Sequence, residues 1–518
     1  MNRILLHRTF GIVAIAVSSS ALTYGLATRT APNSSAPPPI AGAKPSAASV
    51  DDAARWCREA LAADAVVAAR AIESLRAAGP VGLEAFAKVH HGDLLQLYFN
   101  PACGCSGDSA ERRLSDAYDR IAGQRDAVFS NLYWHTDFNA ARRASEREGK
   151  PILSLRMLGK LTEELSCANS RFFRTTLYAD PNVATYLRNN FVLHWHSIRP
   201  VPKLTIDYGD GRKLERTITG NSAHYVVDRR GRLIDVLPGL YSPQAFRREL
   251  DRALEAAQSL ETAYPRAHAA LLAQYHDDRR NSLAMARVEV PVVTMGNSAP
   301  GAFSSDLDIP FPKSSFERTA SRMVTSAPLP DVPARGASAR GEKSKAGMVW
   351  TPMQTAAQPI VPVQTAAPIA ASKGRAVSPP VAYLPVPDEG PLSAATLERL
   401  ADRMQSEIQF HPQAIRLIEA KLDAIPGEYL PGPRESIRRT ALDNLRRGVA
   451  YETARNEYDF HRRAHAYLAQ NWEIRDLDRL DDWVYAELFL MPRSDPWAGL
   501  LNVDSFSAID AAGIVVGK

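Results

Sequence analysis

The chain contains a largely apolar run that leads, through a short loop, into a segment with one cysteine. The run covers residues 152–158, and the loop ends at Cys167-Ala-Asn-Ser170, directly before Arg171-Phe172-Phe173. An apolar run of this length predicts a buried strand, and a strand that feeds a helix predicts an α/β architecture. The same order places Cys167 at a helix N-terminus, where unpaired backbone amides and the helix dipole favour the thiolate.

Ser170 stands where a dithiol site would carry its second sulfur. A thiol at that position lies within one helical turn of Cys167, where it can attack a mixed disulfide and release the partner. A hydroxyl cannot do this. Either Cys167 is a monothiol nucleophile whose thiolate is held by Ser170 and the helix amides, or it is a structural cysteine, buried or paired with an N-terminal cysteine. We favour the structural interpretation because attack without release gives poor turnover.

The sequence around this segment predicts a mixed sheet with helices on both faces. Strands are expected at 191–198, 224–228 and 232–237, a hairpin at 203–219, and helices at 134–148, from 180 onwards and from 242 to about 259. The order βαβ followed by ββα fits such a sheet.

Composition divides the rest of the chain. Fifteen of the 36 prolines lie between 291 and 387, a stretch with few aromatic residues that cannot build a core and is predicted to be disordered. The expected segments are a signal peptide or membrane anchor at 1–28, a disordered tether at 29–50, a helical region at 51–130, the α/β domain at 131–262, a helical extension at 263–290, a disordered linker at 291–388 and an all-α C-terminal domain at 389–518.

The N-terminus predicts export. Basic residues near the start are followed by an uncharged stretch from Thr9 to Thr28, which is typical of a secretory signal. The stretch is long enough that an uncleaved membrane anchor is the alternative. We therefore expect an extracytoplasmic protein, periplasmic or secreted, with membrane association through this segment as the second interpretation.

Four cysteines allow three full pairings in an oxidising compartment: Cys57, Cys103, Cys105 and Cys167. A bridge between Cys103 and Cys105 would be strained and easily reduced, which suits an oxidant or isomerase. A structural bridge from either of them to Cys57 is the interpretation we favour. The sequence does not choose among the pairings.

Charge and motifs exclude several classes of function. The net charge of +5 comes from 62 basic and 57 acidic residues without a long run of one sign, so we expect no nucleic-acid partner. Phosphate-binding loops and serine-triad signatures are missing, and we expect no cofactor. His194 and His196 share a strand face that could bind zinc, with His224 as a third candidate, but ordinary strand packing is favoured and we expect no metal.

Residues 134–257 resemble the thioredoxin-like proteins. The matching positions, in family order, are Trp134 and Asp137, Lys150-Pro151-Ile152, Cys167 to Ser170, Asp180-Pro181 with Val183, Phe191-Val192, Asp228 with Gly231, and Gly239 with Ser242-Pro243. The resemblance implies a thioredoxin fold and, where both cysteines are present, thiol and disulfide chemistry. Two positions depart from the family: Ser170 replaces the second cysteine, and Ser222 stands where the family has a cis-proline.

These observations favour recognition over catalysis. The expected function is an exported thioredoxin-fold scaffold that binds an envelope protein or peptide client, with the linker allowing the C-terminal helices to bind a second one. The alternative is a monothiol thiol-disulfide oxidoreductase or isomerase that acts through Cys167.

Overall fold

The structure is a computed structural model that describes residues 50–101, 109–217, 220–288, 392–425, 427 and 432–496. All of them belong to one compact unit, Ala48–Lys518. The expected leader, the expected linker and the expected tether up to residue 49 lie outside the described residues. None of the described helices combines the length and the apolar character that crossing a bilayer requires.

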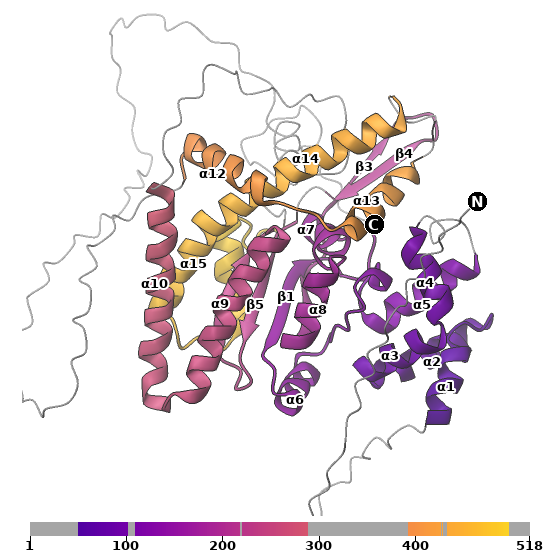
Figure 1. The fold of residues 1–518 in the computed structure, drawn as a ribbon, viewed down its shortest axis with the longest axis horizontal. Coiled ribbons are helices and arrows are strands. Elements are labelled where there is room, and N and C mark those ends of the chain that lie inside the picture. Colours follow the sequence, from indigo (N-terminus) through magenta and orange to yellow (C-terminus); the bar gives the residue numbers. More distant parts are fainter. Residues whose placement is uncertain are drawn as a thin grey trace, which may run out of the picture. The chain divides into compact units, whose positions relative to one another are not determined.

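A four-stranded mixed sheet lies at the centre of the described structure (Figure 1). Its order is β2 (Val192–Arg199), β1 (Ile152–Leu158), β5 (Ser222–Val227), β6 (Leu233–Pro238). β1 runs parallel to β2 and antiparallel to β5, and β5 runs antiparallel to β6. Every residue of β1 is buried, as befits a strand in the interior of the sheet. The predicted mixed sheet with flanking helices is therefore confirmed.

Helical segments connect the parallel strands β1 and β2. They are α7 (Ala168–Phe172), the π-helical turn η3 (Phe173–Leu177) and α8 (Pro181–Asn190). Asp180 starts α8 because its carboxylate accepts hydrogen bonds from the amides of the first turn, and Pro181 occupies a position where no amide is needed.

The helix predicted at 134–148 is shorter than expected. α6 covers Phe138–Glu148, because Asp137 caps it by accepting hydrogen bonds from the amides of the first turn. Trp134 lies before the helix, fully buried, and its indole N–H donates to Gln124 Oε1 at 2.7 Å. Trp134 therefore anchors the entry to the sheet.

The N-terminal helices have a core of their own. They are α1 (Val50–Glu59), α2 (Ala65–Ala77), α3 (Pro80–Val89), α4 (His91–Phe99) and α5 (Ala110–Ala122), followed by the 3-10 turn η2 (Ala127–Phe129). Cys57, Leu75, Phe86 and Ile121 are fully buried in this core. The region joins the sheet through Arg76, whose guanidinium donates to the Trp134 carbonyl at 2.9 Å.

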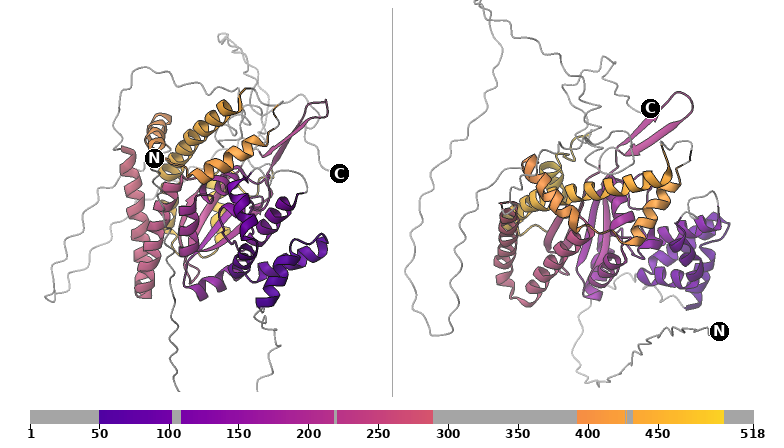
Figure 2. Two further views of the ribbon diagram at one scale, coloured as in Figure 1. Left: turned by 45° about the vertical axis from the view of Figure 1, so that its right-hand side comes forward. Right: turned by 45° about the horizontal axis from the view of Figure 1, so that its top comes forward.

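A separate two-stranded sheet forms the hairpin predicted between β2 and β5. Its strands are β3 (Lys203–Asp207) and β4 (Lys213–Thr217). Side chains along both strands alternate between exposed and half-buried until Thr217, which is buried. Figure 2 shows the hairpin standing apart from the four-stranded sheet.

Helices dominate the chain after β6. Before residue 289 they are α9 (Pro243–Thr262), the 3-10 turn η4 (Pro265–Ala267) and α10 (His268–Val288). The C-terminal elements are α12 (Ala394–Glu407), α13 (Pro412–Asp423), α14 (Arg434–Arg455), η6 (Asn456–His461), α15 (Arg462–Gln470), α16 (Leu477–Trp483) and η7 (Val484–Leu488), where η6 and η7 are π-helical turns.

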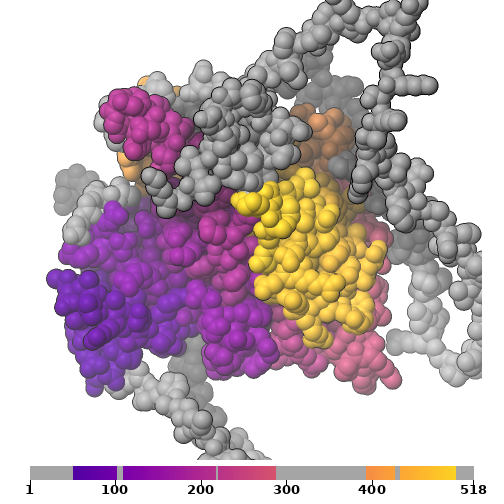
Figure 3. Space-filling model, turned by 180° about the vertical axis from the view of Figure 1, so that it is seen from behind, coloured from indigo at the N-terminus to yellow at the C-terminus, as the bar shows by residue number. Residues whose placement is uncertain are grey.

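The C-terminal helices pack on the sheet. Leu445 and Val484 belong to the same hydrophobic core as Leu155 and Val236 of the sheet. α10 packs along α15, and α12 packs on α14. Figure 3 shows the C-terminal segment, in yellow, forming one face of the molecule directly beside residues of the α/β part. The segment is helical, as predicted, but it shares the core of the sheet instead of building a separate one.

Candidate functional site

Cys167 lies where the sequence places it, directly before the first residue of α7. Its sulfur accepts a hydrogen bond from the Ser170 amide at 3.4 Å, which makes Cys167 the N-cap of the helix. The residue is fully buried in the main core. A helix N-terminus favours the thiolate, whereas burial opposes a charge, so the geometry contains both influences.

The Ser170 hydroxyl does not contact the thiol. It lies 2.6 Å from Ser166 Oγ and 2.9 Å from the Cys167 carbonyl oxygen, and it is fully buried. The expected role of Ser170 in holding a thiolate therefore falls to its backbone amide. The hydroxyl acts within the loop and the first helical turn.

A loop before β5 packs directly against Cys167. A side chain at Gly220 would bring its Cβ within 2.6 Å of the Cys167 Cβ, so only glycine fits there. Ser222, at the position of the family's cis-proline, accepts a hydrogen bond from Asn169 Nδ2 at 3.0 Å. The loop and the first residue of β5 thus both contact the start of α7.

The chain's own C-terminal segment covers this loop. Tyr485 of η7 donates its hydroxyl proton to the Asn221 carbonyl at 2.9 Å, and Asn221 Nδ2 lies 3.1 Å from Met491 Sδ. Burial, then the charges of Asp481 and Cys167, raise the pKa of Tyr485 well above 10. Tyr485 and Met491 thus both contact Asn221, the residue that follows Gly220, whose backbone packs against Cys167.

An ionic contact holds the preceding helix, α16, against the sheet. Arg156 of β1 donates to Asp481 Oδ2 at 2.8 Å, and the Tyr225 hydroxyl of β5 donates to Asp481 Oδ1 at 2.7 Å. Burial raises the pKa of Asp481 to about 6, against the opposing charge of Arg156. Asp478 adds a second, exposed contact to Arg156 at 2.7 Å.

The structure does not bring the other described cysteine to Cys167. Cys57 is a buried thiol in the N-terminal helical core, a different cluster from that of Cys167, and neither described cysteine is in a disulfide. Burial raises the pKa of Cys57. Cys103 and Cys105 lie outside the described residues, so the favoured bridge to Cys57 remains a prediction.

The three candidate zinc ligands of the sheet are not brought together. His194 pairs with Ser154 of β1 and His224 pairs with the next residue, so the two rings lie on opposite faces of the sheet. His194 Nδ1 lies 2.8 Å from Ser154 Oγ, and His224 Nε2 lies 2.8 Å from the Tyr178 hydroxyl. Burial lowers the pKa of each to about 3. His196 is exposed.

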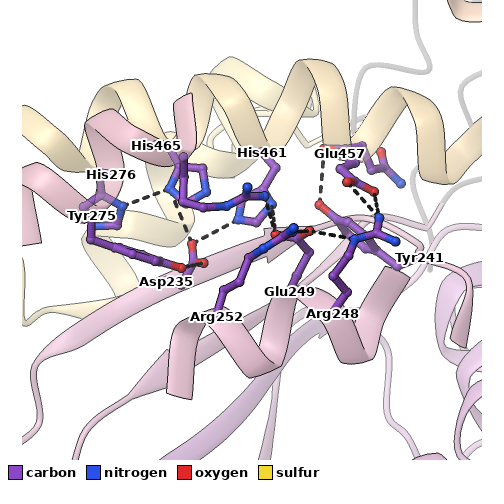
Figure 4. A network of polar contacts seen from close by, with 12 residues as sticks. Asp235, Tyr241, Arg248, Glu249, Arg252, Tyr275, His276, Glu457, His461 and His465 are labelled. Carbon is purple, nitrogen blue, oxygen red and sulfur yellow. Dashed lines mark hydrogen bonds and ion pairs between the residues drawn. The ribbon is translucent and has the colours of Figure 1, made fainter. Parts of the chain in front are cut away.

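A buried cluster of histidines around one carboxylate lies elsewhere, between β6 and the helices (Figure 4). Asp235 of β6 accepts a hydrogen bond from the Tyr275 hydroxyl at 2.7 Å, and its Oδ1 lies 3.0 Å from His461 Nε2. His276 Nδ1 of α10 lies 2.9 Å from His465 Nδ1 of α15. Asp235, His276 and His465 are each 2% exposed or less. We call Asp235, Tyr275, His276, His461 and His465 the histidine cluster.

A second carboxylate, Glu249 of α9, extends the cluster toward basic residues. Its partners are Arg279 at 2.7 Å and Arg252 on its own helix, and it is fully buried. Arg248, the residue directly before it, lies 3.5 Å from Glu249 and pairs with Glu457 of η6 at 2.7 Å. Glu249 is therefore neutralised by arginines, whereas no arginine or lysine of the described residues forms an ion pair with Asp235.

The ionisation states in the histidine cluster follow from burial and mutual charge. Burial lowers the pKa of His276 to about 4 and lowers the pKa of His465 well below 6.5. For Asp235, burial acts to raise the pKa, but the charges of His461 and His465 outweigh it and the pKa falls. The lowered pKa favours the ionised form of the Asp235 carboxylate.

Sequence reasoning missed this cluster. His461 and His465 stand four residues apart on continuous helix, a spacing that aligns two imidazoles on one face and could have drawn attention. Asp235 and His276 carry no such local signal, because one lies in a short strand and the other in a separate helix.

A cavity of about 410 Å³ lies behind the Cys167 helix. Its apolar lining includes Leu97, Val128, Phe129, Leu417 and Ile418, and its charged lining includes Asp119, Arg125, Asp126, Glu164, Arg171, Arg174 and Lys421. Asp126 lies 3.3 Å from Arg174 and 3.0 Å from Lys421. Burial and the charge of Asp126 raise the pKa of Asp119 to about 7. The cavity thus offers an apolar wall beside charges of both signs.

No protein-family model, curated protein or solved structure matches this chain.

Proposed function

We propose that this chain is an exported, thioredoxin-like protein that binds a peptide segment of another envelope protein and does not turn over disulfides. The order of elements supports the family assignment: a β–α–β unit with parallel strands is followed by two antiparallel strands and a closing helix, α9. The chain departs from that plan by adding helices at both ends and the hairpin β3–β4.

The observation that carries the proposal is the complete burial of Cys167 beside a loop that the chain's own C-terminal segment contacts. Disulfide exchange requires the attacking sulfur to reach a client sulfur. Here the sulfur is fully buried, and the neighbouring Asn221 is engaged by Tyr485 and Met491. A client disulfide would first have to open the packing around the buried sulfur. The loop beside it is contacted by η7, and the preceding helix α16 is held to the sheet by Arg156 and Tyr225 through Asp481.

We assign binding to the cavity behind the Cys167 helix. A pocket of this size with an apolar wall and a few converging polar groups is the usual form of a ligand site. Arg174 and Lys421 meet Asp126 there, so a peptide that presents one apolar side chain beside a charged one would find partners for both. Because the C-terminal helices belong to the main core, we assign one binding site and no second module.

Site-specific photo-crosslinking in the cell envelope tests this assignment. A photoreactive residue at Ser115, which is half-buried and lines the cavity from α5, should give a discrete crosslinked protein. The same residue at Arg120, exposed on the same helix and outside the lining, is the matched control. Excess untagged protein should compete the adduct away. Equal crosslinking at the two positions, or none at Ser115, would contradict the proposal.

The second candidate is a monothiol oxidoreductase, favoured by the hydrogen bond from the Ser170 amide to the Cys167 sulfur. That contact, at the start of a helix, stabilises a thiolate once the sulfur is reached. Insulin reduction with an external thiol separates the candidates. Our proposal predicts the same rate for the wild type and for Cys167→Ala, and multiple turnovers that vanish in Cys167→Ala would establish the enzyme.

A further inference from the structure

We propose that the histidine cluster is a closed, structural site for a zinc-type divalent cation, with Asp235, His276 and His465 as ligands. The ligand atoms of these three side chains lie within 4.8 Å of one another. They come from β6, α10 and α15, three elements that lie far apart in the sequence. The proposal is independent of the peptide-binding function proposed above.

The spacing of the donor atoms fits tetrahedral coordination. Zinc binds nitrogen and carboxylate oxygen at about 2.0–2.2 Å, so two of its tetrahedral ligand atoms stand about 3.3 Å apart. The separation of His276 Nδ1 and His465 Nδ1 is 2.9 Å, and that of His465 Nδ1 and Asp235 Oδ1 is 3.9 Å. An ion between the three side chains therefore needs only small rotations of their rings and carboxylate.

Both carboxylate oxygens of Asp235 have polar neighbours that fix its orientation. The Tyr275 hydroxyl donates to Oδ2 at 2.7 Å. Oδ1, the oxygen that lies 3.9 Å from His465 Nδ1, accepts a hydrogen bond from the Val236 amide at 2.8 Å and lies 3.0 Å from His461 Nε2. Outer contacts of this kind orient ligands in metal sites and raise their affinity. His461 thus supports the carboxylate and is not counted among the three ligands.

Charge gives a second reason. Among the described residues, the buried Glu249 is neutralised by arginines, whereas Asp235 has no arginine or lysine partner. A buried carboxylate is stabilised by a neighbouring cation, and a metal ion held between Asp235 and the two imidazoles would supply one. Imidazole nitrogen with one carboxylate is a donor set that suits zinc better than calcium or magnesium, which prefer all-oxygen sites.

The site would tie together segments on both sides of residues 289–391. Asp235 and His276 precede that stretch, and His465 follows it on α15, which packs along α10. All three ligands are buried, so the cation would enter during folding and stay enclosed. We therefore expect slow exchange and a structural role.

Refolding of the full chain with a spectroscopic metal tests the site. Protein stripped by chelator in denaturant and refolded with Co²⁺ should retain one equivalent and show the visible bands of tetrahedral nitrogen and oxygen ligation. His276→Gln should weaken retention at least tenfold, while His196→Gln, which alters an exposed histidine, should leave it unchanged. Zn²⁺ should raise the unfolding temperature of the wild type by at least about 2 °C.

Several results would overturn the proposal. They are the absence of a retained equivalent, equal retention in His276→Gln, or a cobalt spectrum with sulfur charge-transfer bands. If His276→Gln does not fold, X-ray absorption of the zinc-loaded wild type decides instead, because the site requires imidazole scattering and no sulfur in the first shell. A metal-free protein whose cluster is stabilised only by a protonated histidine would bind no cobalt, and would contradict the proposal.

Discussion

The Cys167 region and the histidine cluster are both buried polar sites on one sheet, but they differ in how the chain builds them. Cys167 and Ser170 lie within one helical turn, and a segment far away in the sequence, η7, contacts the loop that packs against Cys167. The histidine cluster is assembled entirely from elements that lie far apart in the sequence, and its members contact one another. A short sequence motif therefore predicts the Cys167 site, whereas the histidine cluster becomes visible only in the folded structure.

The two sites also differ in what they contribute. Around the cluster, arginines and carboxylates are paired in the interior, so each partner depends on the others to remain there. Around Cys167, neutral hydrogen bonds dominate, and Arg156 holds α16 to the sheet through ion pairs with Asp478 and Asp481. We therefore expect substitutions in and around the histidine cluster to lower the free energy of unfolding most, and substitutions near Cys167 to change the access of reagents to its sulfur.

The largest effect should follow removal of Glu249. Glu249→Ala leaves Arg279 buried without its carboxylate, which should lower the free energy of unfolding by about 3–5 kcal/mol, measured by denaturant titration. Glu255→Ala, at an exposed position on the same helix, is the control and should change it by less than about 0.5 kcal/mol. Equal losses in the two variants would show that the cluster is not the dominant polar anchor.

A smaller effect should appear in the pH dependence of the free energy of unfolding, through Asp481 of α16. Burial raises the pKa of Asp481 to about 6 in the folded protein, so the folded state binds this proton more tightly than the unfolded chain does. The stabilising contribution is complete below about pH 4 and is lost as the pH rises through about 6, a change on the order of 2 kcal/mol. Asp481→Asn should lack this fall.

Asp482, the exposed residue next to Asp481, provides the control for this pH dependence. Asp482→Asn alters a residue whose side chain is 64% exposed, and it should follow the wild-type profile of unfolding free energy against pH. Parallel profiles for the wild type and Asp481→Asn between pH 4 and 7 would show that Asp481 is ionised as easily in the fold as in the unfolded chain.

The smallest effect concerns the hydrogen bond from the Tyr485 hydroxyl to the Asn221 carbonyl, in the loop beside Cys167. Tyr485→Phe leaves the buried Asn221 carbonyl without its donor, which should cost about 1 kcal/mol and speed alkylation of Cys167. Tyr264→Phe, at a 74% exposed ring, should do neither. A stability loss without faster alkylation would separate the hydrogen bond from access to the sulfur.

Local signals explain what the sequence predicted well. The strand at 152–158 is read from its apolar run, and the starts of α8 and α9 are read from Asp180-Pro181 and Ser242-Pro243, because capping acts within a few residues. The same locality explains the error at Trp134, where the cap at Asp137 decides the helix start.

Long-range packing explains what the sequence did not predict. An amphipathic helix shows which face it buries but not against what, so the docking of α15 and α16 on the sheet had no sequence signal. The hydrogen bond from Tyr485 to Asn221, beside Cys167, and the contact between Asp235 and His465 both depend on that docking. The sequence therefore identified the thiol and missed both its cover and the cluster.

Alkylation of Cys167 in the native protein tests the central claim most directly. Reduced full-length protein is treated with a small maleimide, and labelling of the Cys167 peptide is followed by mass spectrometry against the same protein in denaturant. If η7 closes the site, native labelling should be at least about a hundredfold slower than denatured labelling at equal pH. Native labelling at the rate of an unprotected thiol would contradict the account.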